Sequence, residues 1–294
     1  MKYTRFLVIL TLIFSLLTGC GSNLDSEAAT PANGGTAGTI VATTYPMYYL
    51  CQQLLTGTDG ITVEALITEE VSCLHDYTIT TTQMRMIESA DLIVMNGAGL
   101  EHFMESALEA VPAEKLVDSS VGVALIGDDP HIWLDPERYA QQCQNIAAAL
   151  LEQFPDQVII KANAEDLAKE LRDFKESRAI QLQTSGAEKN IITFHDGFTY
   201  FADAFGLNIL AAIEEEEGAE PSAAELNEIC KLVEENALTR VYVEKNGSTS
   251  AAEIISTETS AEIKTISMIM SDSGNGYLAD MEDNLQTIMT EVLE

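Results

Sequence analysis

The sequence predicts an α/β protein of two lobes with parallel-rich sheets, joined by a long rigid α-helix. Short β-branched segments alternate with helical ones from residue 39 onward, and strand, helix and strand in alternation form parallel sheets. An amphipathic, alanine-rich stretch of about 28 residues begins at residue 156 and is longer than most helices within one domain. The length of 294 residues accommodates two lobes.

The first lobe is predicted over residues 38–155. Strands are expected at residues 39–44, 62–67 and 92–96, and helices at residues 47–55 and 83–90, from their hydrophobic periodicity. Pro46 turns the chain from the first strand into the first helix, and Gly97 and Gly99 close the third strand.

The connecting helix is predicted over residues 156–185 and the second lobe over residues 186–294. Strands are expected at residues 190–194, 240–243 and 263–266, and helices at residues 198–205, 223–236, 250–259 and 277–293. Ser222 precedes Glu225 by three positions, which is the pattern of a capping box.

The first twenty residues have the pattern of a lipoprotein signal peptide. Lys2 and Arg5 precede an apolar run over residues 6–17, and Leu17-Thr18-Gly19-Cys20 forms a lipobox. We therefore expect cleavage and acylation at Cys20, which would anchor the mature protein to the outer face of the cell membrane. Residues 21–37 are rich in small polar residues and read as a flexible tether. No later segment is apolar enough to span a membrane, so we expect an extracytoplasmic, lipid-anchored protein.

The formal net charge of −32 excludes nucleic acid as a partner. The charge is typical of a solvated surface and also attracts cations at low ionic strength. Residues 214–217 are four consecutive glutamates, which could form a weak cation-collecting loop. We favour a solvent-exposed turn, because adjacent carboxylates of this kind are usually only solvated. Four cysteines besides Cys20 show no CxxC spacing, so disulfides are possible but not required: Cys51, Cys73, Cys143 and Cys230. Cys51, Cys143 and Cys230 sit in helical apolar patterns, where a buried thiol is the default.

Three histidines stand where an apolar segment or strand gives way to a loop: His75, His131 and His195. The loops after the carboxyl ends of parallel strands form the ligand crevice, and His195 follows a predicted strand in this way. Neutral imidazole is a favoured ligand of zinc and its neighbours. Asp76 and Asp196 directly follow two of the histidines and either accept a hydrogen bond from the ring or cap a helix. We expect His102 on the surface of a helix.

Several blocks resemble the metal-specific solute-binding lipoproteins of ABC importers, the zinc and manganese binders also described as adhesin-type. They lie in order at residues 40–46, 74–77, 90–101, 129–133, 193–198 and 221–222. The resemblance implies that His75, His131 and His195 are metal ligands and that the long helix joins two lobes with the site in the cleft. It further implies capture of a transition-metal ion and its delivery to an ABC permease in the same membrane.

The fourth ligand departs from the family pattern. The family places an aspartate after the strand at residues 263–266, where this sequence has Ser267. Glu244 follows the neighbouring strand and is our preferred fourth ligand; water, Asp272 and Cys73 are the other candidates.

Three imidazoles favour zinc over manganese, which prefers oxygen ligands. A monomeric, non-enzymatic receptor is our prediction. Two alternatives stay open, because three histidines with an open position also form catalytic zinc sites, and because the metal of a surface adhesin can be structural.

Overall fold

The computed structural model describes residues 37–69, 74, 77–214, 221–245 and 247–289. All of them fall in one compact unit, residues 34–294. The predicted signal peptide with Cys20, the tether as far as residue 36, and the side chains of Cys73 and His75 lie outside the described residues. Within the described part of the chain, no helix is long and apolar enough to cross a membrane.

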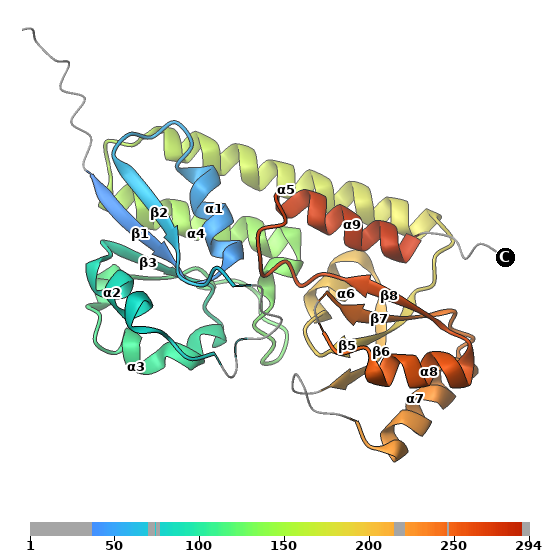
Figure 1. The fold of residues 1–294 in the computed structure, drawn as a ribbon. Coiled ribbons are helices and arrows are strands. Elements are labelled where there is room, and N and C mark those ends of the chain that lie inside the picture. The colour runs from blue at the N-terminus through green and yellow to red at the C-terminus, as the bar shows by residue number, and fades with distance from the viewer. Residues whose placement is uncertain (1–36, 70–73, 75–76, 215–220, 246, 290–294) are drawn as a thin grey trace, which may run out of the picture. The chain divides into compact units, whose positions relative to one another are not determined.

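The first lobe contains a parallel sheet of four strands in the order β2-β1-β3-β4 (Figure 1). Its strands are β1 (Gly38–Ala42), β2 (Ile61–Ala65), β3 (Leu92–Met95) and β4 (Leu116–Asp118). The helices that accompany it are α1 (Tyr45–Leu54), α2 (Thr81–Ser89), α3 (Glu105–Leu108) and α4 (Pro136–Gln153). Three short 3-10 helices complete the lobe: η1 (Leu100–Met104), η2 (Ala113–Lys115) and η3 (Ile132–Leu134).

The second lobe repeats this plan with a parallel sheet in the order β6-β5-β7-β8. Its strands are β5 (Asn190–His195), β6 (Asn208–Glu214), β7 (Arg240–Glu244) and β8 (Glu262–Ile266), and its helices are α6 (Thr199–Phe205), α7 (Ala223–Glu235), α8 (Ser250–Thr259) and α9 (Tyr277–Met289). The predicted capping box opens α7: the Ser222 hydroxyl accepts from the Glu225 amide at 3.3 Å, and the Glu225 carboxylate accepts from the Ser222 amide at 2.6 Å.

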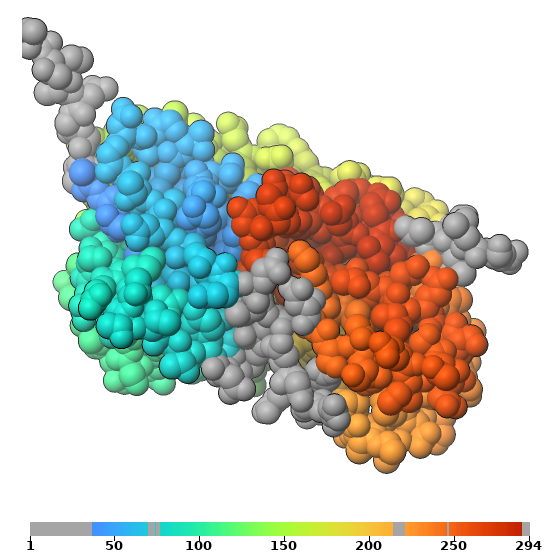
Figure 2. Space-filling model, viewed as in Figure 1, coloured from blue at the N-terminus to red at the C-terminus, as the bar shows by residue number. Residues whose placement is uncertain are grey.

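Helix α5 (Ile159–Thr184) bridges the two lobes. Its 26 residues span about 39 Å at 1.5 Å per residue. It contacts α4 and α1 of the first lobe and α6 and α9 of the second, and Figure 2 shows the red atoms of α9 against the yellow-green atoms of α5. The predicted fold class, two parallel-sheet lobes joined by a long helix, is confirmed.

The sequence analysis did not predict two edge strands, β4 and β6. Strand β4 has only three residues, too few for a recognisable alternation. Strand β6 reads Asn-Ile-Leu-Ala-Ala-Ile-Glu, and its central alanines have low strand propensity. Both strands form because the neighbouring strand supplies hydrogen-bond partners, which local composition does not reveal.

A buried tryptophan joins the two lobes. Trp133 is fully buried, its indole Nε1 donates to the carbonyl oxygen of Met268 at 2.7 Å, and its own carbonyl accepts from the Tyr277 hydroxyl at 2.6 Å. The Tyr277 ring lies 4.3 Å from that of Tyr139, whose hydroxyl donates to the carbonyl of Pro46 at 2.5 Å. The segment before α4 is therefore fixed both to the turn after β8 and to the start of α9.

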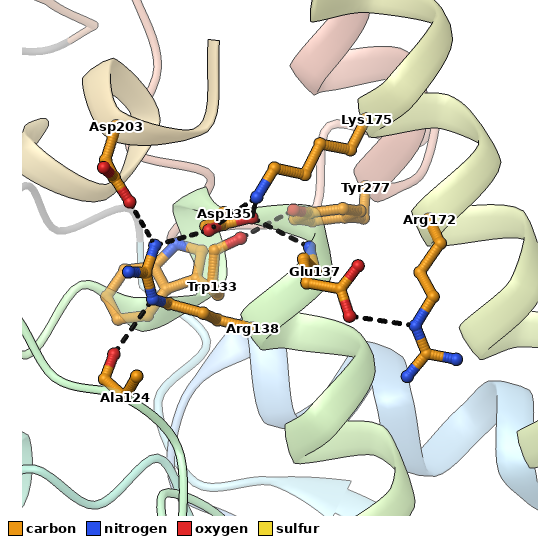
Figure 3. A network of polar contacts seen from close by, with 9 residues as sticks. All are labelled: Ala124, Trp133, Asp135, Glu137, Arg138, Arg172, Lys175, Asp203 and Tyr277. Carbon is orange, nitrogen blue, oxygen red and sulfur yellow. Dashed lines mark hydrogen bonds and ion pairs between the residues drawn. The ribbon is translucent and has the colours of Figure 1, made fainter. Parts of the chain in front are cut away.

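An ionic network reinforces the same junction (Figure 3). Asp135 is buried and caps α4 by accepting from the amide of Glu137 at 2.8 Å. Its carboxylate pairs with Arg138 at 2.5 Å and with Lys175 of α5 at 2.8 Å. Arg138 continues to Asp203 of α6 at 2.7 Å. Removing a cation from buried Asp135 would leave an uncompensated charge, so its two pairs fix α4 against α5. The more exposed Arg138–Asp203 pair extends the network to α6.

The carboxyl ends of β1 and β3 are tied together by Glu101, which is buried. Its carboxylate accepts from the Thr43 hydroxyl at 2.8 Å and from the amides of Asn96 at 2.7 Å and Gly97 at 3.0 Å. Burial raises the pKa of Glu101 to about 6, although the three donors favour the ionised form.

Replacing Tyr277 by Phe should lower the free energy of unfolding by about 1–3 kcal/mol, because the buried Trp133 carbonyl loses a hydrogen bond. Urea unfolding measures the change. Tyr48→Phe is the matched control, since the Tyr48 hydroxyl accepts only an exposed bond from Gln52. Equal effects of the two substitutions would refute the role assigned to the Tyr277 hydroxyl.

Glu101 should make the stability pH-dependent. Its pKa in the folded protein lies above the usual value of 4.5, so between about pH 4.5 and 6 the native state binds more protons than the unfolded state. The contribution of Glu101 to the free energy of unfolding therefore falls by roughly 2 kcal/mol as pH rises through this window. Urea unfolding at pH 4 and pH 7 should show that loss in the wild type and in the exposed control variant Glu105→Gln, but not in Glu101→Gln. Parallel pH profiles for wild type and Glu101→Gln would disprove it.

Candidate metal centre

His195 ends β5, at the carboxyl edge of the second sheet, and only 5% of the residue is exposed. The following turn needs a glycine: a Cβ at position 197 would lie 2.6 Å from Cδ2 of His195 and 2.7 Å from Cε of Met268. Gly197 thus allows the turn to pass close to both the imidazole and the Met268 side chain.

His131 stands at the start of η3 in the first lobe and is 8% exposed. Asp129 Oδ1 accepts from the His131 amide at 2.8 Å and contacts ring Nδ1 at 2.7 Å. An ionised carboxylate only accepts hydrogen bonds, so this contact places the ring proton on Nδ1 and leaves Nε2 with a lone pair for a metal. Burial alone raises the pKa of Asp129, but hydrogen bonds from His131 oppose it, and the pKa lies below its usual value.

The structure brings these two predicted ligands together. The ring centroids of His131 and His195 lie 5.3 Å apart with their planes at 85°, and the Trp133 ring lies 5.2 Å from that of His131. One imidazole comes from each lobe, so an ion held by both would connect the lobes directly.

Glu244 ends β7, the strand next to β5. Thr193 and Tyr242 are register partners on these strands, and His195 and Glu244 each lie two residues further along. Glu244 is 6% exposed at the same carboxyl edge. Within the residues that the structure describes, no three His, Cys, Asp or Glu side chains gather closely enough to hold a metal. His75 lies outside that part of the chain, so the full ligand set, Glu244 included, stays a prediction.

Ser267 is engaged in a turn. Its hydroxyl accepts from the amide of Ile269 at 3.0 Å, and Asn284 pairs with the Ser267 amide at 2.7 Å and carbonyl at 2.8 Å. Ile269 has a φ of +58°, a left-handed conformation unusual for a β-branched residue. Asp272, the other candidate ligand, is exposed and accepts from the amide of Gly274 at 2.9 Å.

The sequence analysis missed Asp129 as the hydrogen-bond partner of the predicted ligand His131. It considered Asp76 and Asp196 either for such a role or as helix caps; Asp196 is exposed and Asp76 lies outside the described residues. The available signal was the Asp129-Pro130-His131 segment, in which an acid two positions before a histidine can reach its ring. His102 is exposed on η1, as expected.

The described cysteines are poor metal ligands. Cys51 and Cys143 are buried free thiols and Cys230 is a half-buried one. Burial raises the pKa of Cys143 to about 12 and also raises that of Cys51 and Cys230. Because the thiolate is the form that binds metal, these thiols do not compete for the ion.

Comparison with known proteins identifies the family of the chain. Residues 40–291 match the family model of ZnuA, described as zinc-uptake complex component A, periplasmic. The chain is 26% identical over 316 residues to the high-affinity zinc uptake system protein ZnuA of Bacillus subtilis, covering 98% of this chain and 97% of that protein. It is 26% identical to the zinc-binding lipoprotein AdcA of Streptococcus pneumoniae, covering 85% of this chain and 54% of AdcA.

Solved structures share the fold across most of the chain. A crystal structure of ZnuA superposes with a TM-score of 0.75 at 29% identity, covering 86% of this chain and 98% of that one. The laminin-binding protein Lmb of Streptococcus agalactiae, described as bifunctional with adhesin and metal-transporting activity, gives a TM-score of 0.77 at 26% identity, with 86% and 98% coverage. The Zn(II)-bound ZnuA-like domain of Streptococcus pneumoniae AdcA gives 0.74 at 28%, with 86% and 98% coverage.

The family consists of solute-binding proteins without enzymatic activity, which confirms the prediction of a non-enzymatic receptor and overturns the zinc-hydrolase alternative. From the family match, the shared fold and the paired histidines together, we conclude that the chain belongs to the ZnuA family of metal-binding solute-binding proteins.

Proposed function

We propose that this protein is the extracytoplasmic receptor of a zinc importer, held on the membrane through a lipid on Cys20, and that it delivers Zn²⁺ to an ABC permease in the same membrane. The observation that carries the proposal is the pair of buried imidazoles, His131 and His195, that face each other from different lobes at 5.3 Å. The names of its relatives, a zinc uptake protein and a zinc-binding lipoprotein, support the same metal.

His75, His131, His195 and Glu244 form the proposed ligand set. Three imidazoles and one carboxylate complete the four-coordinate site that zinc prefers. Manganese favours oxygen donors and is expected to bind more weakly to this set. Neutral imidazole is the ligand form, so protons compete with the metal and capture should weaken as the solution is acidified.

Capture and release are constrained by the junction around the site. Trp133 connects the His131 segment to Met268, and the Asp135 network connects α4, α5 and α6. Wide opening about a hinge would break these contacts together. We therefore expect release through small lobe shifts or local rearrangement of ligand segments.

Loss of either paired histidine should weaken zinc binding. Protein lacking residues 1–20 should bind one Zn²⁺ in calorimetry, and His131→Ala or His195→Ala should each weaken binding at least about 100-fold, because each removes a direct ligand. Mn²⁺ should bind more weakly than Zn²⁺ to the wild type. The exposed His102→Ala is the matched control and should leave the affinity unchanged. Undiminished zinc affinity in both site variants would refute the proposed site.

Loss of the Glu244 charge should also weaken zinc binding. Glu244→Gln keeps the shape of the side chain but removes its charge, and zinc affinity should fall about 10- to 100-fold with the one-to-one stoichiometry retained. Exposed Glu235→Gln in the same lobe is the control. If Glu244→Gln binds zinc as the wild type does, another group or water supplies the fourth position.

A further inference from the structure

We infer that Asn96 is a positioning residue for the metal site: its buried carboxamide fixes the peptide that carries His131 to the sheet of the first lobe. The inference rests on the proposed function, since it treats His131 as a ligand. It adds to that function a residue which lies directly after β3 and outside the predicted ligand set.

The Asn96 side chain is fully buried, and each of its polar atoms has a partner. Its amide nitrogen donates to the carbonyl of Pro130 at 2.8 Å and to that of Gly97 at 3.0 Å. Its Oδ1 accepts from Nε2 of Gln142 at 2.9 Å. Two carbonyl oxygens on one side and an amide donor on the other fix the orientation of the carboxamide.

The backbone of Asn96 is equally constrained. Its amide donates to the buried Glu101 carboxylate at 2.7 Å. Its carbonyl accepts from the Ser119 hydroxyl at 3.0 Å and from Nε2 of Gln142 at 3.2 Å. Residues of η1 and α4 and the residue after β4 therefore all form hydrogen bonds with Asn96. Because its backbone is fixed in this way, its side chain can hold the Pro130 carbonyl in one position.

The Pro130 carbonyl is half of the peptide group that leads into His131. The same oxygen also accepts from the amide of Ile132 at 2.8 Å, and the N–H of that peptide group, the His131 amide, donates to Asp129 at 2.8 Å. Both polar ends of one planar unit are thus fixed. Asn96 connects this unit to the sheet, while Asp129 orients the ring beyond it, so the two residues set the position and the rotation of the imidazole.

A purely structural role for Asn96 predicts something different. In that case removal of its hydrogen bonds would lower stability, and zinc affinity would change only as it does for any other member of the network. Ser119 supplies the comparison: it is also fully buried, and its hydroxyl contacts Met47 Sδ, the Asn96 carbonyl and Gln142 Nε2. Ser119→Ala therefore weakens the network and leaves the Asn96–Pro130 bond in place.

The test compares Asn96→Ala with Ser119→Ala by three measurements. Zinc affinity comes from competition with a chelator, and metal-free stability from thermal unfolding. The third is the ¹⁵N-histidine NMR spectrum of the metal-free protein. The chain has four histidines, so the spectrum of His131→Ala assigns the His131 signals.

Asn96→Ala should weaken zinc binding about 10- to 100-fold, the range typical of groups that orient a ligand, and should shift or broaden the His131 signals. Ser119→Ala should lower the melting temperature while affinity and the His131 signals stay close to wild type.

The outcomes separate the inference from the function on which it rests. If the two variants change zinc affinity and the His131 signals alike, Asn96 is structural and the inference is wrong. If wild-type protein binds no zinc, the proposed function fails, but the metal-free spectra still decide whether Asn96 positions His131. Should Asn96→Ala not fold, Asn96→Ser, which retains a small polar group but cannot span to Pro130, replaces it with the same expected results.

Discussion

The hydrogen bond from the Trp133 indole to the Met268 carbonyl is the contact on which the arrangement of the site depends. Trp133 lies two residues after His131, and Met268 packs against the turn that follows His195. One buried bond therefore links the segments that carry the two paired imidazoles. Burying an indole N–H without a hydrogen-bond partner costs free energy, and Trp133 is fully buried. The bond therefore favours one position of the two segments relative to each other.

Near that contact, the buried carboxylate of Asp135 is neutralised by positively charged side chains. Asp135 is almost completely buried, yet it caps a helix and meets two cations, one from α4 and one from α5. Such a network contributes more to specificity of arrangement than to net stability, because desolvation offsets much of the Coulomb energy. The ionic contacts and the tryptophan thus fix the same junction by different physical means.

The sequence was sufficient for the lobes and the connecting helix, because hydrophobic periodicity is a local signal. The crevice rule for parallel sheets placed His195 at the carboxyl edge of its sheet, whereas the association of His131 with His195 was implied by the resemblance to the metal-binding lipoproteins. It was insufficient for β4 and β6, which depend on a neighbouring strand. It also missed Asp129, since the direction of a side chain depends on the backbone of a 3-10 turn. The fourth ligand could not be predicted for a further reason: Ser267 removes the carboxylate expected there, and replacement requires knowing which side chains approach from other strands.

The missing Cβ at Gly197 has a consequence for the loading of the proposed site. A side chain at this position would meet both the His195 ring and the Met268 side chain, so glycine lets the turn pass close to the imidazole. In the proposed site, a ligand packed this closely before the ion arrives would lose little side-chain entropy on binding. Position 197 would then influence metal capture through the neighbouring ring, without contributing a ligand of its own.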